Sequence, residues 1–192
     1  MPSTLWRNAT LATMDAQIDG AYGLLHRHDV LVNQGYITDI QPTGRLSADT
    51  VIELNESLIT PSLIDSHTHL VFGGSRAGEW ERRQNGESYQ AISAEGGGIN
   101  ATVRATRDSS AADLYALSEK RLQNYMDEGV GLIEIKSGYG LNLEAERKCL
   151  QIATELGEKH HIAISRTLLS AHAIPPEYKG RADEYLQVVT DD

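Results

Sequence analysis

Residues 63–72, which read LIDSHTHLVF, carry two histidines one residue apart inside an apolar run. Apolar residues on both sides of a polar insert are typical of a short buried β-strand. Side chains alternate between the faces of a strand, so His67 and His69 are expected to point the same way and Thr68 the other way. Two imidazoles at this spacing can bind one metal ion, and imidazole suits zinc and iron. The alternative is a pair of core histidines, but two unpaired imidazoles would be costly to bury.

The composition is that of a globular protein with one ordinary domain, or with a small domain and part of a larger one. The 192 residues are 40% hydrophobic and 23% charged, and the formal net charge is −10. This acidic balance argues against nucleic-acid binding, for which a basic patch is typical. The single cysteine, Cys149, excludes an internal disulfide framework and lies in a helical context where a packed apolar role is expected. We expect neither a signal peptide nor a membrane segment, and therefore a cytoplasmic protein.

Residues 1–59 predict a small β domain. The segments that alternate or are apolar are 5–11, 29–32, 35–40 and 51–54. We expect these strands to be the N-terminal part of a composite, β-sandwich-like domain that lacks some of its strands. A second His-x-His pair, His26 and His28, has charged neighbours, and we expect it in a solvated polar turn.

From residue 60 to residue 192 the sequence predicts helices that alternate with apolar strands. Strands are expected at 63–72, 131–136 and 162–169, and helices near 88–93, 110–129, 142–158 and from 182. This alternation is typical of βα units around a parallel sheet. A complete barrel has about eight such units and roughly 250 residues. We therefore predict an α/β fold with the first strands of a partial (β/α)8 TIM-type barrel; a small open α/β domain is the alternative.

The strand ends carry the candidate functional residues, because chemistry in α/β folds gathers at the carboxyl ends of parallel strands. Arg76 follows the histidine pair and offers a planar fork for a carboxylate, or is a solvated loop arginine. Tyr139 can stack on a planar ring or donate a hydrogen bond to it, or it covers the edge of the core. His172 can bind metal, hydrogen-bond a substrate or hold its loop. Lys136 can pair with charges near Glu134, or it can be a carboxylated bridge between two metals.

Four blocks, in this order, resemble the imidazolonepropionase family of the amidohydrolase superfamily. They are HTHLVFGGSR at 67–76, GGGI at 96–99, EIKSGYG at 134–140 and LLSAH at 168–172. The likeness runs through essentially the whole chain, whereas many relatives would share the His-x-His pair alone. The sequence departs from the family pattern at Ser62 and Ser66, where glycine and proline are usual, and neither change affects a ligating atom.

The resemblance implies hydrolysis of the small molecule 4-imidazolone-5-propanoate to N-formimidoyl-L-glutamate, with one zinc or iron ion per complete site. It implies that His67 and His69 bind the metal and that Arg76 binds the propanoate carboxylate. Tyr139 and His172 are implied to lie near the imidazolone ring. A homodimer stays open for a full-length enzyme.

The resemblance also implies ligands that this sequence lacks. In the family a third metal histidine, a nearby glutamate and a metal-binding aspartate come from later strands, after residue 192. A catalytic zinc site typically keeps three protein ligands and an open water position. We therefore expect the full-length parent to be the enzyme and this chain alone to be an inactive fragment with no catalytic residue of its own. A single-metal site argues against a carboxylated Lys136.

Two other functions are open alternatives. One is a different cyclic-amide hydrolase or deaminase of the same superfamily, such as a hydantoinase-like or guanine-deaminase-like enzyme. The other is a non-catalytic metal-binding or interaction module. Unpaired strands at the edge of an incomplete barrel are an aggregation hazard, which disfavours the module.

Overall fold

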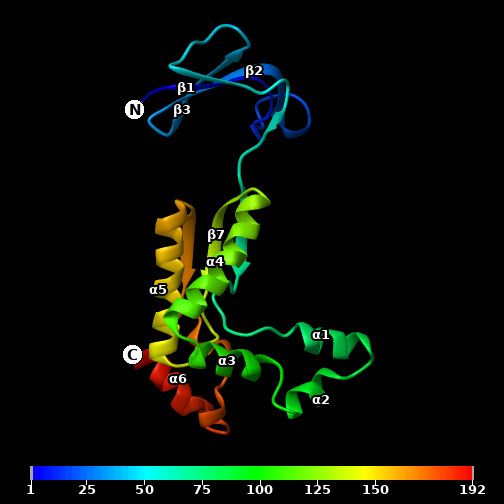
Figure 1. The fold of residues 1–192 in the computed structure, drawn as a ribbon, viewed down its shortest axis with the longest axis vertical. Coiled ribbons are helices and arrows are strands. Elements are labelled where there is room, and N and C mark those ends of the chain that lie inside the picture. The colour runs from blue at the N-terminus through cyan, green and yellow to red at the C-terminus, as the bar shows by residue number, and fades with distance from the viewer. Residues whose placement is uncertain (1, 192) are drawn as a thin grey trace. The chain divides into compact units, whose positions relative to one another are not determined.

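The computed structural model describes residues 2–191, which form two compact units, with the division between Pro61 and Ser62. The first unit is a five-stranded sheet (Figure 1). Its elements are β1 (Thr4–Ala12), a short 3-10 turn (Ala21–Gly23), β2 (Leu24–Asn33), β3 (Tyr36–Pro42), β4 (Thr50–Glu53) and β5 (Leu58–Ile59). The four strands expected from alternation are confirmed. The fifth strand, β5, is not predicted, because two residues are too few to show a pattern.

Strand β1 lies at the centre of this sheet. It pairs antiparallel with β2 and parallel with β4 and β5, and β3 adds to the outer edge of β2. The expectation that His26 and His28 lie in a polar turn is wrong, because both belong to β2. The strand forms through backbone pairing with β1, which does not depend on how polar the side chains are. Arg27 between the histidines has a positive φ of 54°, where the ladder with β1 is irregular.

The core of the first unit is small. Its buried apolar residues centre on Ala9, Leu11 and Val30. Several large apolar side chains of the same unit are exposed, among them Ile37 and Leu58. A single sheet, with no second layer among residues 2–61, accounts for this exposure, and the sandwich itself stays a prediction.

The second unit contains three parallel strands and six α-helices among its described residues. The strands are β6 (Leu63–Thr68), β7 (Val130–Lys136) and β8 (Ala163–Thr167). The helices are α1 (Ala77–Gln84), α2 (Tyr89–Ala94), α3 (Ile99–Asp108), α4 (Ala111–Asp127), α5 (Leu143–His160) and α6 (Ala182–Asp191), with 3-10 turns at Ser170–His172 and Pro176–Tyr178. The order β6-β7-β8 with parallel pairing confirms the predicted βα units.

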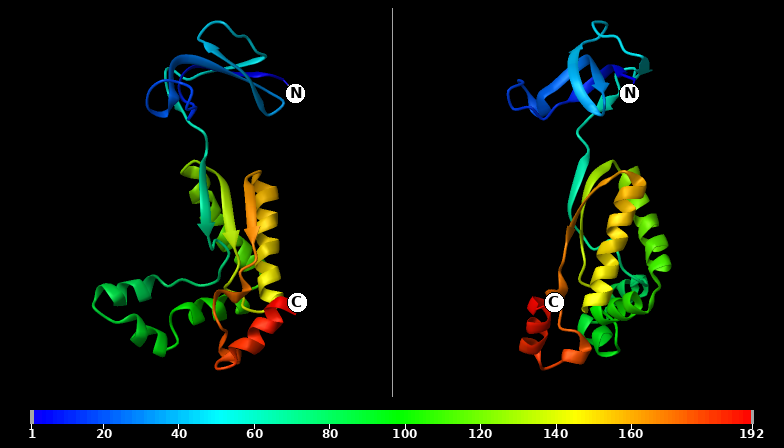
Figure 2. Two further views of the ribbon diagram at one scale, coloured as in Figure 1. Left: turned by 180° about the vertical axis from the view of Figure 1, so that it is seen from behind. Right: turned by 90° about the vertical axis from the view of Figure 1, so that its left-hand side faces the viewer.

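Helices α4 and α5 cover one face of this sheet (Figure 2). Ile133 and Ile135 of β7 are buried under them together with Leu122 and Leu156. Cys149 belongs to the same core, and burial raises the pKa of its thiol to about 12, which confirms a packed rather than a reactive cysteine.

The first strand of this sheet, β6, differs from the sequence prediction. Residues 63–72 were expected to form a buried strand, but β6 ends at Thr68, and Leu63 and Ile64 are exposed. Leu70 and Val71, just after the strand, are the residues that enter the core. Leu63 and Ile64 point to opposite faces of β6, the edge strand of this sheet, and both faces lack cover at its apolar start among the described residues.

Helix caps fix where the loops at the strand ends begin. The Ser110 side chain accepts a hydrogen bond from the Asp113 amide at 3.1 Å, and Asn142 accepts one from the Ala145 amide at 2.8 Å. These caps start α4 and α5 close to the predicted residues. None of the helices among residues 2–191 combines the length and the apolarity needed to cross a bilayer.

Candidate functional site

The His67/His69 pair lies at the carboxyl end of β6. His67 is the fifth residue of the strand and His69 is the first residue after it. Their ring centroids are 5.8 Å apart, with the rings close to perpendicular at 70°. His67 is exposed, whereas His69 is partly buried. The two imidazoles are therefore close neighbours, as the spacing predicts.

Tyr139 and His172 surround His69. The ring of Tyr139 lies 4.9 Å from that of His69, and the ring of His172 lies 4.8 Å from it. Tyr139 and His172 are 5.7 Å apart, and Phe72 approaches Tyr139 at 6.0 Å. Parallel strands end at one edge of the sheet, and this is what brings residues so distant in sequence together. Four of the five predicted site residues thus form one ring cluster: His67, His69, Tyr139 and His172.

The loops after β7 and β8 are in close contact at Gly138. Its φ is +119°, and a Cβ there would lie 2.9 Å from the Cβ of His172. Only glycine fits this combination of backbone conformation and space. The hydroxyl of Ser137 also accepts a hydrogen bond from the Leu169 amide at 3.1 Å. The loops that carry Tyr139 and His172 are therefore packed on each other.

The environment of His69 favours its neutral imidazole. Burial lowers the pKa of His69, and the nearby His172 and His67 lower it further. Its Nδ1 is buried without a hydrogen-bond partner among the described residues. A neutral imidazole with an unsatisfied nitrogen is the state in which histidine binds metals.

The possible metal ligands among the described residues do not form a complete set. His67 and His69 have suitable chemistry, but residues 2–191 contain no group of three or more His, Cys, Asp or Glu side chains arranged to hold a metal ion. The residues present therefore fit a metal as two of its ligands, and the set needs others to be complete.

Lys136 pairs with Glu134, as one of the two sequence alternatives predicts. Its Nζ lies 2.5 Å from Oε1 of Glu134, and the Thr167 hydroxyl donates to the same oxygen at 2.5 Å. The hydrogen bonds from Lys136 and Thr167 lower the pKa of Glu134. The structure therefore places Lys136 in an ion pair with Glu134, the first of the two alternatives.

Arg76 is placed differently from the other predicted residues. It occupies the N-cap position of α1, and its Nε lies 3.6 Å from Oε2 of Glu79. Arg76 thus pairs with Glu79 rather than with a member of the ring cluster. The sequence predicts no helix before residue 88, whereas α1 begins at Ala77. The polar composition of this helix, which has no buried residue, hides it from a search for apolar periodicity.

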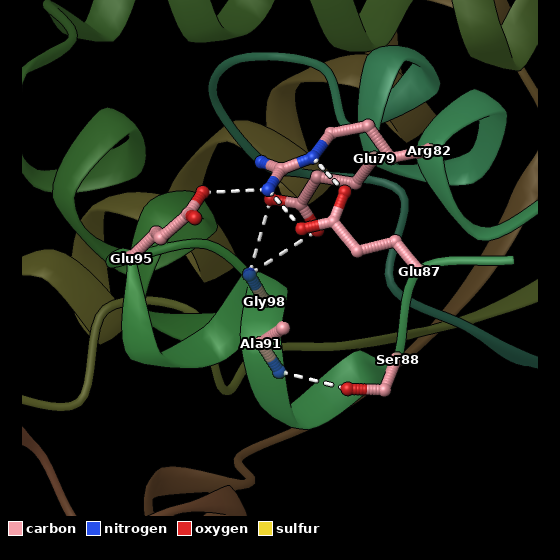
Figure 3. A network of polar contacts seen from close by, with 7 residues as sticks. All are labelled: Glu79, Arg82, Glu87, Ser88, Ala91, Glu95 and Gly98. Carbon is pink, nitrogen blue, oxygen red and sulfur yellow. Dashed lines mark hydrogen bonds and ion pairs between the residues drawn. The ribbon is translucent and has the colours of Figure 1, made fainter. Parts of the chain in front are cut away.

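Glu79, the ion-pair partner of Arg76, also contacts the glycine-rich turn at 96–98, and Figure 3 shows its contact with Gly98. Its two carboxylate oxygens accept hydrogen bonds from the Gly98 amide at 3.0 and 3.2 Å. Arg82, one turn further along α1, donates to both Glu87 and Glu95, which ties α1 to the ends of α2. Sequence reasoning missed Glu79, although an acid three residues after an arginine at a helix start is a recognisable pairing signal.

No protein-family model matches the chain. Proteins named imidazolonepropionase are similar to nearly all of it. The relative from Klebsiella pneumoniae is 55% identical over 187 residues, which are 97% of this chain and 46% of that protein. The relative from Photorhabdus laumondii is 54% identical over 190 residues, covering 98% of this chain and 46% of its own length. The chain thus spans about half the length of the curated relatives it matches.

Solved structures share the fold at low sequence identity. A triazine hydrolase matches with a TM-score of 0.59 at 15% identity, over 88% of this chain and 36% of that chain. Atrazine chlorohydrolase from Arthrobacter aurescens, solved complexed with zinc, matches with a TM-score of 0.54 at 14% identity, over 98% of this chain and 43% of its own. An amidohydrolase matches with a TM-score of 0.54 at 16% identity. This chain is therefore similar to the imidazolonepropionases over a little under half of their length, and it shares its fold with a solved amidohydrolase.

Proposed function

We propose that this chain is part of an imidazolonepropionase, which hydrolyses 4-imidazolone-5-propanoate to N-formimidoyl-L-glutamate. One observation carries the proposal. His67, His69, Tyr139 and His172 gather at the ends of three parallel strands, in a chain 55% identical to proteins of that name. The reaction adds water across a cyclic amide carbon–nitrogen bond and opens the ring. Because the chain spans 46% of such a protein, the activity is assigned to a protein of the relatives' length.

We assign His67 and His69 as two protein ligands of a single zinc or iron ion. Imidazole suits both metals, and the pair lies where α/β enzymes place their chemistry. When bound, the ion would act as a Lewis acid in the hydrolysis of the ring amide. Since residues 2–191 contain no group of three His, Cys, Asp or Glu side chains arranged to hold a metal ion, the remaining ligands and the catalytic carboxylate come from segments outside this chain. The isolated chain is accordingly inactive.

The other three residues bind the substrate. Tyr139 and His172 flank His69, so a ring held against them lies beside the metal ligands. Arg76 receives the propanoate carboxylate. Its side chain is 43% exposed, and a single 3.6 Å ion pair with Glu79 leaves most of its five N–H donors free for a second carboxylate.

The architecture of the whole protein is also a proposal. Residues 60–192 are the first βα units of a (β/α)8 barrel, supported by three parallel strands with helices on one face. Residues 1–59 are the N-terminal part of a composite β domain, supported by the exposed apolar side chains of its single sheet. The acidic composition and the single buried cysteine favour a cytoplasmic enzyme.

The test uses a metal-loaded protein of the relatives' length that contains this sequence. We expect it to hydrolyse 4-imidazolone-5-propanoate, and we expect the isolated 192-residue chain to show no turnover. Arg76→Met is expected to raise KM roughly tenfold to a hundredfold, because a charge-assisted carboxylate contact of about 1.5–3 kcal/mol is lost. Arg83→Met, which changes an exposed arginine on the same helix, is the matched control and is expected to leave KM unchanged.

Two outcomes would contradict the proposal. One is turnover of a hydantoin or of guanine in preference to the imidazolone, which would favour another amidohydrolase activity. The other is metal-dependent turnover by the isolated chain, which would show that its own residues complete the site. An imidazolone without the propanoate group separates the role of Arg76 from general substrate binding, since Arg76→Met should not change its hydrolysis.

A further inference from the structure

The loop between β7 and α5, residues 137–141, is bound on its two sides by side chains of opposite charge. The loop carries Tyr139 between Gly138 and Gly140. Glu146 of α5 binds the backbone amides of the loop, and Arg107 of α3 binds its backbone carbonyls. Neither side chain touches the ring cluster. Their common target is the backbone that presents Tyr139.

Glu146 is a buried carboxylate, with 1% of its surface exposed. Its Oε2 accepts a hydrogen bond from the Gly138 amide at 2.8 Å. Its Oε1 accepts hydrogen bonds from the amides of Gly140 at 2.8 Å and Leu141 at 2.6 Å. Hydrogen bonds to an ionised group are stronger than neutral ones, and a carboxylate can accept all three at once. The two oxygens therefore hold the backbone on both sides of Tyr139 by hydrogen bonds to its amides.

Arg107 closes the loop from the carbonyl side. Its Nε donates to the Gly140 carbonyl at 2.6 Å and a terminal nitrogen donates to the Leu141 carbonyl at 3.2 Å. The same guanidinium is paired with Glu177 at 2.8 Å, in the segment just after His172. A guanidinium presents its donors in a rigid fork, so these contacts fix a direction as well as a distance.

We propose that Glu146 and Arg107 are positioning residues that act through loop 137–141 to hold Tyr139 against the substrate ring. The inference rests on the proposed function. Tyr139 has a small neighbour on each side and lies at ring distances of 4.9 to 6.0 Å from His69, His172 and Phe72. Such ring contacts alone leave the loop backbone free to shift. The hydrogen bonds of Glu146 and Arg107 to the loop backbone together form a clamp that removes this freedom.

The geometry predicts what happens when the clamp is weakened. In Glu146→Gln, an NH2 group replaces one acceptor oxygen and faces a backbone N–H, so at least one loop amide loses its partner. The loop then shifts and carries Tyr139 with it. A misplacement on the scale of an ångström can cost roughly a hundredfold in an enzyme.

The experiment measures kcat and KM for 4-imidazolone-5-propanoate with the metal-loaded protein of the relatives' length. We expect Glu146→Gln to raise KM roughly tenfold to a hundredfold with a smaller change in kcat. Arg107→Lys, which keeps the charge but loses the fork, is expected to act in the same direction. Glu144→Gln, an exposed acid in the same helical turn, is the matched control and is expected to leave both constants unchanged.

A double substitution separates positioning from general stability. In a Tyr139→Ala background the clamp has nothing left to position, so Glu146→Gln should change KM by less than about twofold. An undiminished KM effect without Tyr139 would overturn the proposal. So would a folded Glu146→Gln protein with an unchanged KM. Loss of folding in both Glu146→Gln and Arg107→Lys would overturn it too, because it would assign the pair to fold stability.

Hydrogen exchange tests the clamp independently of the reaction. In Glu146→Gln the amides of 138–141 should exchange faster, whereas Glu144→Gln should leave them protected. If the unmodified protein does not hydrolyse the imidazolone while this exchange pattern holds, the proposed function fails but the clamp on the loop stands. Unchanged exchange in Glu146→Gln would reject the clamp whatever the substrate.

Discussion

The chain carries two His-x-His pairs with different surroundings. In the first pair, Nδ1 of His28 lies 2.9 Å from the carbonyl oxygen of His26, its own chain neighbour. Nδ1 of His26 lies 3.4 Å from the Thr10 hydroxyl. The rings of this pair have local polar partners.

The second pair ends a strand of a parallel sheet. His69 has Tyr139 and His172 within 5 Å between ring centroids, and its Nδ1 is buried without a partner among the described residues. Identical spacing thus gives two outcomes. The spacing alone places two imidazoles near each other. The sheet topology determines which distant residues, here Tyr139 and His172, lie beside them.

Loss of the second pair should have the largest effect. In the protein of the relatives' length, His67→Ala combined with His69→Ala should abolish stoichiometric metal binding. The lost metal is worth several kcal/mol of transition-state stabilisation, which corresponds to a fall in kcat on the order of a thousandfold or more. Metal analysis and kcat measure the two effects.

The first pair provides the control for that experiment. His26→Ala combined with His28→Ala should leave the metal content and kcat unchanged, because these rings bond to neighbouring groups of the same sheet. Equal losses from the two double variants would remove the distinction between the pairs.

Periodicity and turn residues predicted much of the fold. The parallel strands and helices α4 and α5 follow from apolar spacing and from caps such as Ser110 and Asn142. The clustering of Tyr139 and His172 around His69 also followed, because parallel strands end at one edge. These features depend on rules that act over a few residues or on the topology of βα units.

Other features could not be predicted from the sequence alone. Helix α1 has no buried residue, so no apolar stripe marks it. The contact of Glu146 with three loop amides depends on how α5 meets the loop after β7, and an acid in a first helical turn has many other uses. The contact of Arg76 with Glu79 depends on where α1 begins, and the polar composition of that helix does not reveal its start.

Substitution of Asp29, the acid next to the first pair, should give the second-largest effect. Asp29 is fully buried and accepts hydrogen bonds from the Asn8 amide at 2.9 Å and the Gly44 amide at 3.0 Å. Asp29→Asn leaves one buried amide without a good acceptor and should lower the free energy of unfolding of the first unit by about 1–3 kcal/mol at pH 7. Urea unfolding followed by Trp6 fluorescence, in a Trp80→Phe background, measures this.

The same carboxylate predicts a pH dependence. Burial raises the pKa of Asp29, but the hydrogen bonds from Asn8 and Gly44 outweigh it and place the pKa below the ordinary value of 3.8. The stabilisation is therefore present above that ordinary value and is lost as the pH falls through the folded-state pKa. Asp29→Asn should remove this acid-side loss, while Asp19→Asn, at an exposed position, should retain it. An identical acid-side loss in the Asp29 variant would contradict the assignment.

The middle residue of the second pair should give a smaller effect. The Thr68 hydroxyl donates to the Glu134 carbonyl at 2.6 Å and is buried between β6 and β7. Thr68→Val keeps the shape and removes this hydrogen bond, so the free energy of unfolding of the second unit should fall by about 0.5–1.5 kcal/mol. Urea unfolding followed by Trp80 fluorescence in a Trp6→Phe background measures it. Lost metal affinity with unchanged stability would instead give Thr68 a direct role in the site.

Substitution of Arg27, the middle residue of the first pair, should have the smallest effect on the free energy of unfolding. The result is informative when it is compared with the same substitution at Thr68. Arg27 has φ +54°, a conformation that costs most residues about 1–2 kcal/mol. Glycine relieves that strain but adds about 0.5–1 kcal/mol of chain entropy. It also removes an exposed ion pair with Glu56, worth about 0–1 kcal/mol.

Arg27→Gly should therefore change the free energy of unfolding of the first unit by less than about 1 kcal/mol. Arg27→Ala, which keeps the strain and also loses the ion pair, should be the less stable of the two variants in urea unfolding. Thr68→Gly, by contrast, should be clearly destabilising, because it removes a buried side chain and its hydrogen bond and relieves no positive φ. The opposite responses follow from the backbone, because Arg27 has a positive φ and Thr68 does not. Equal responses of the two positions to glycine would mean that the backbone does not distinguish the two pairs.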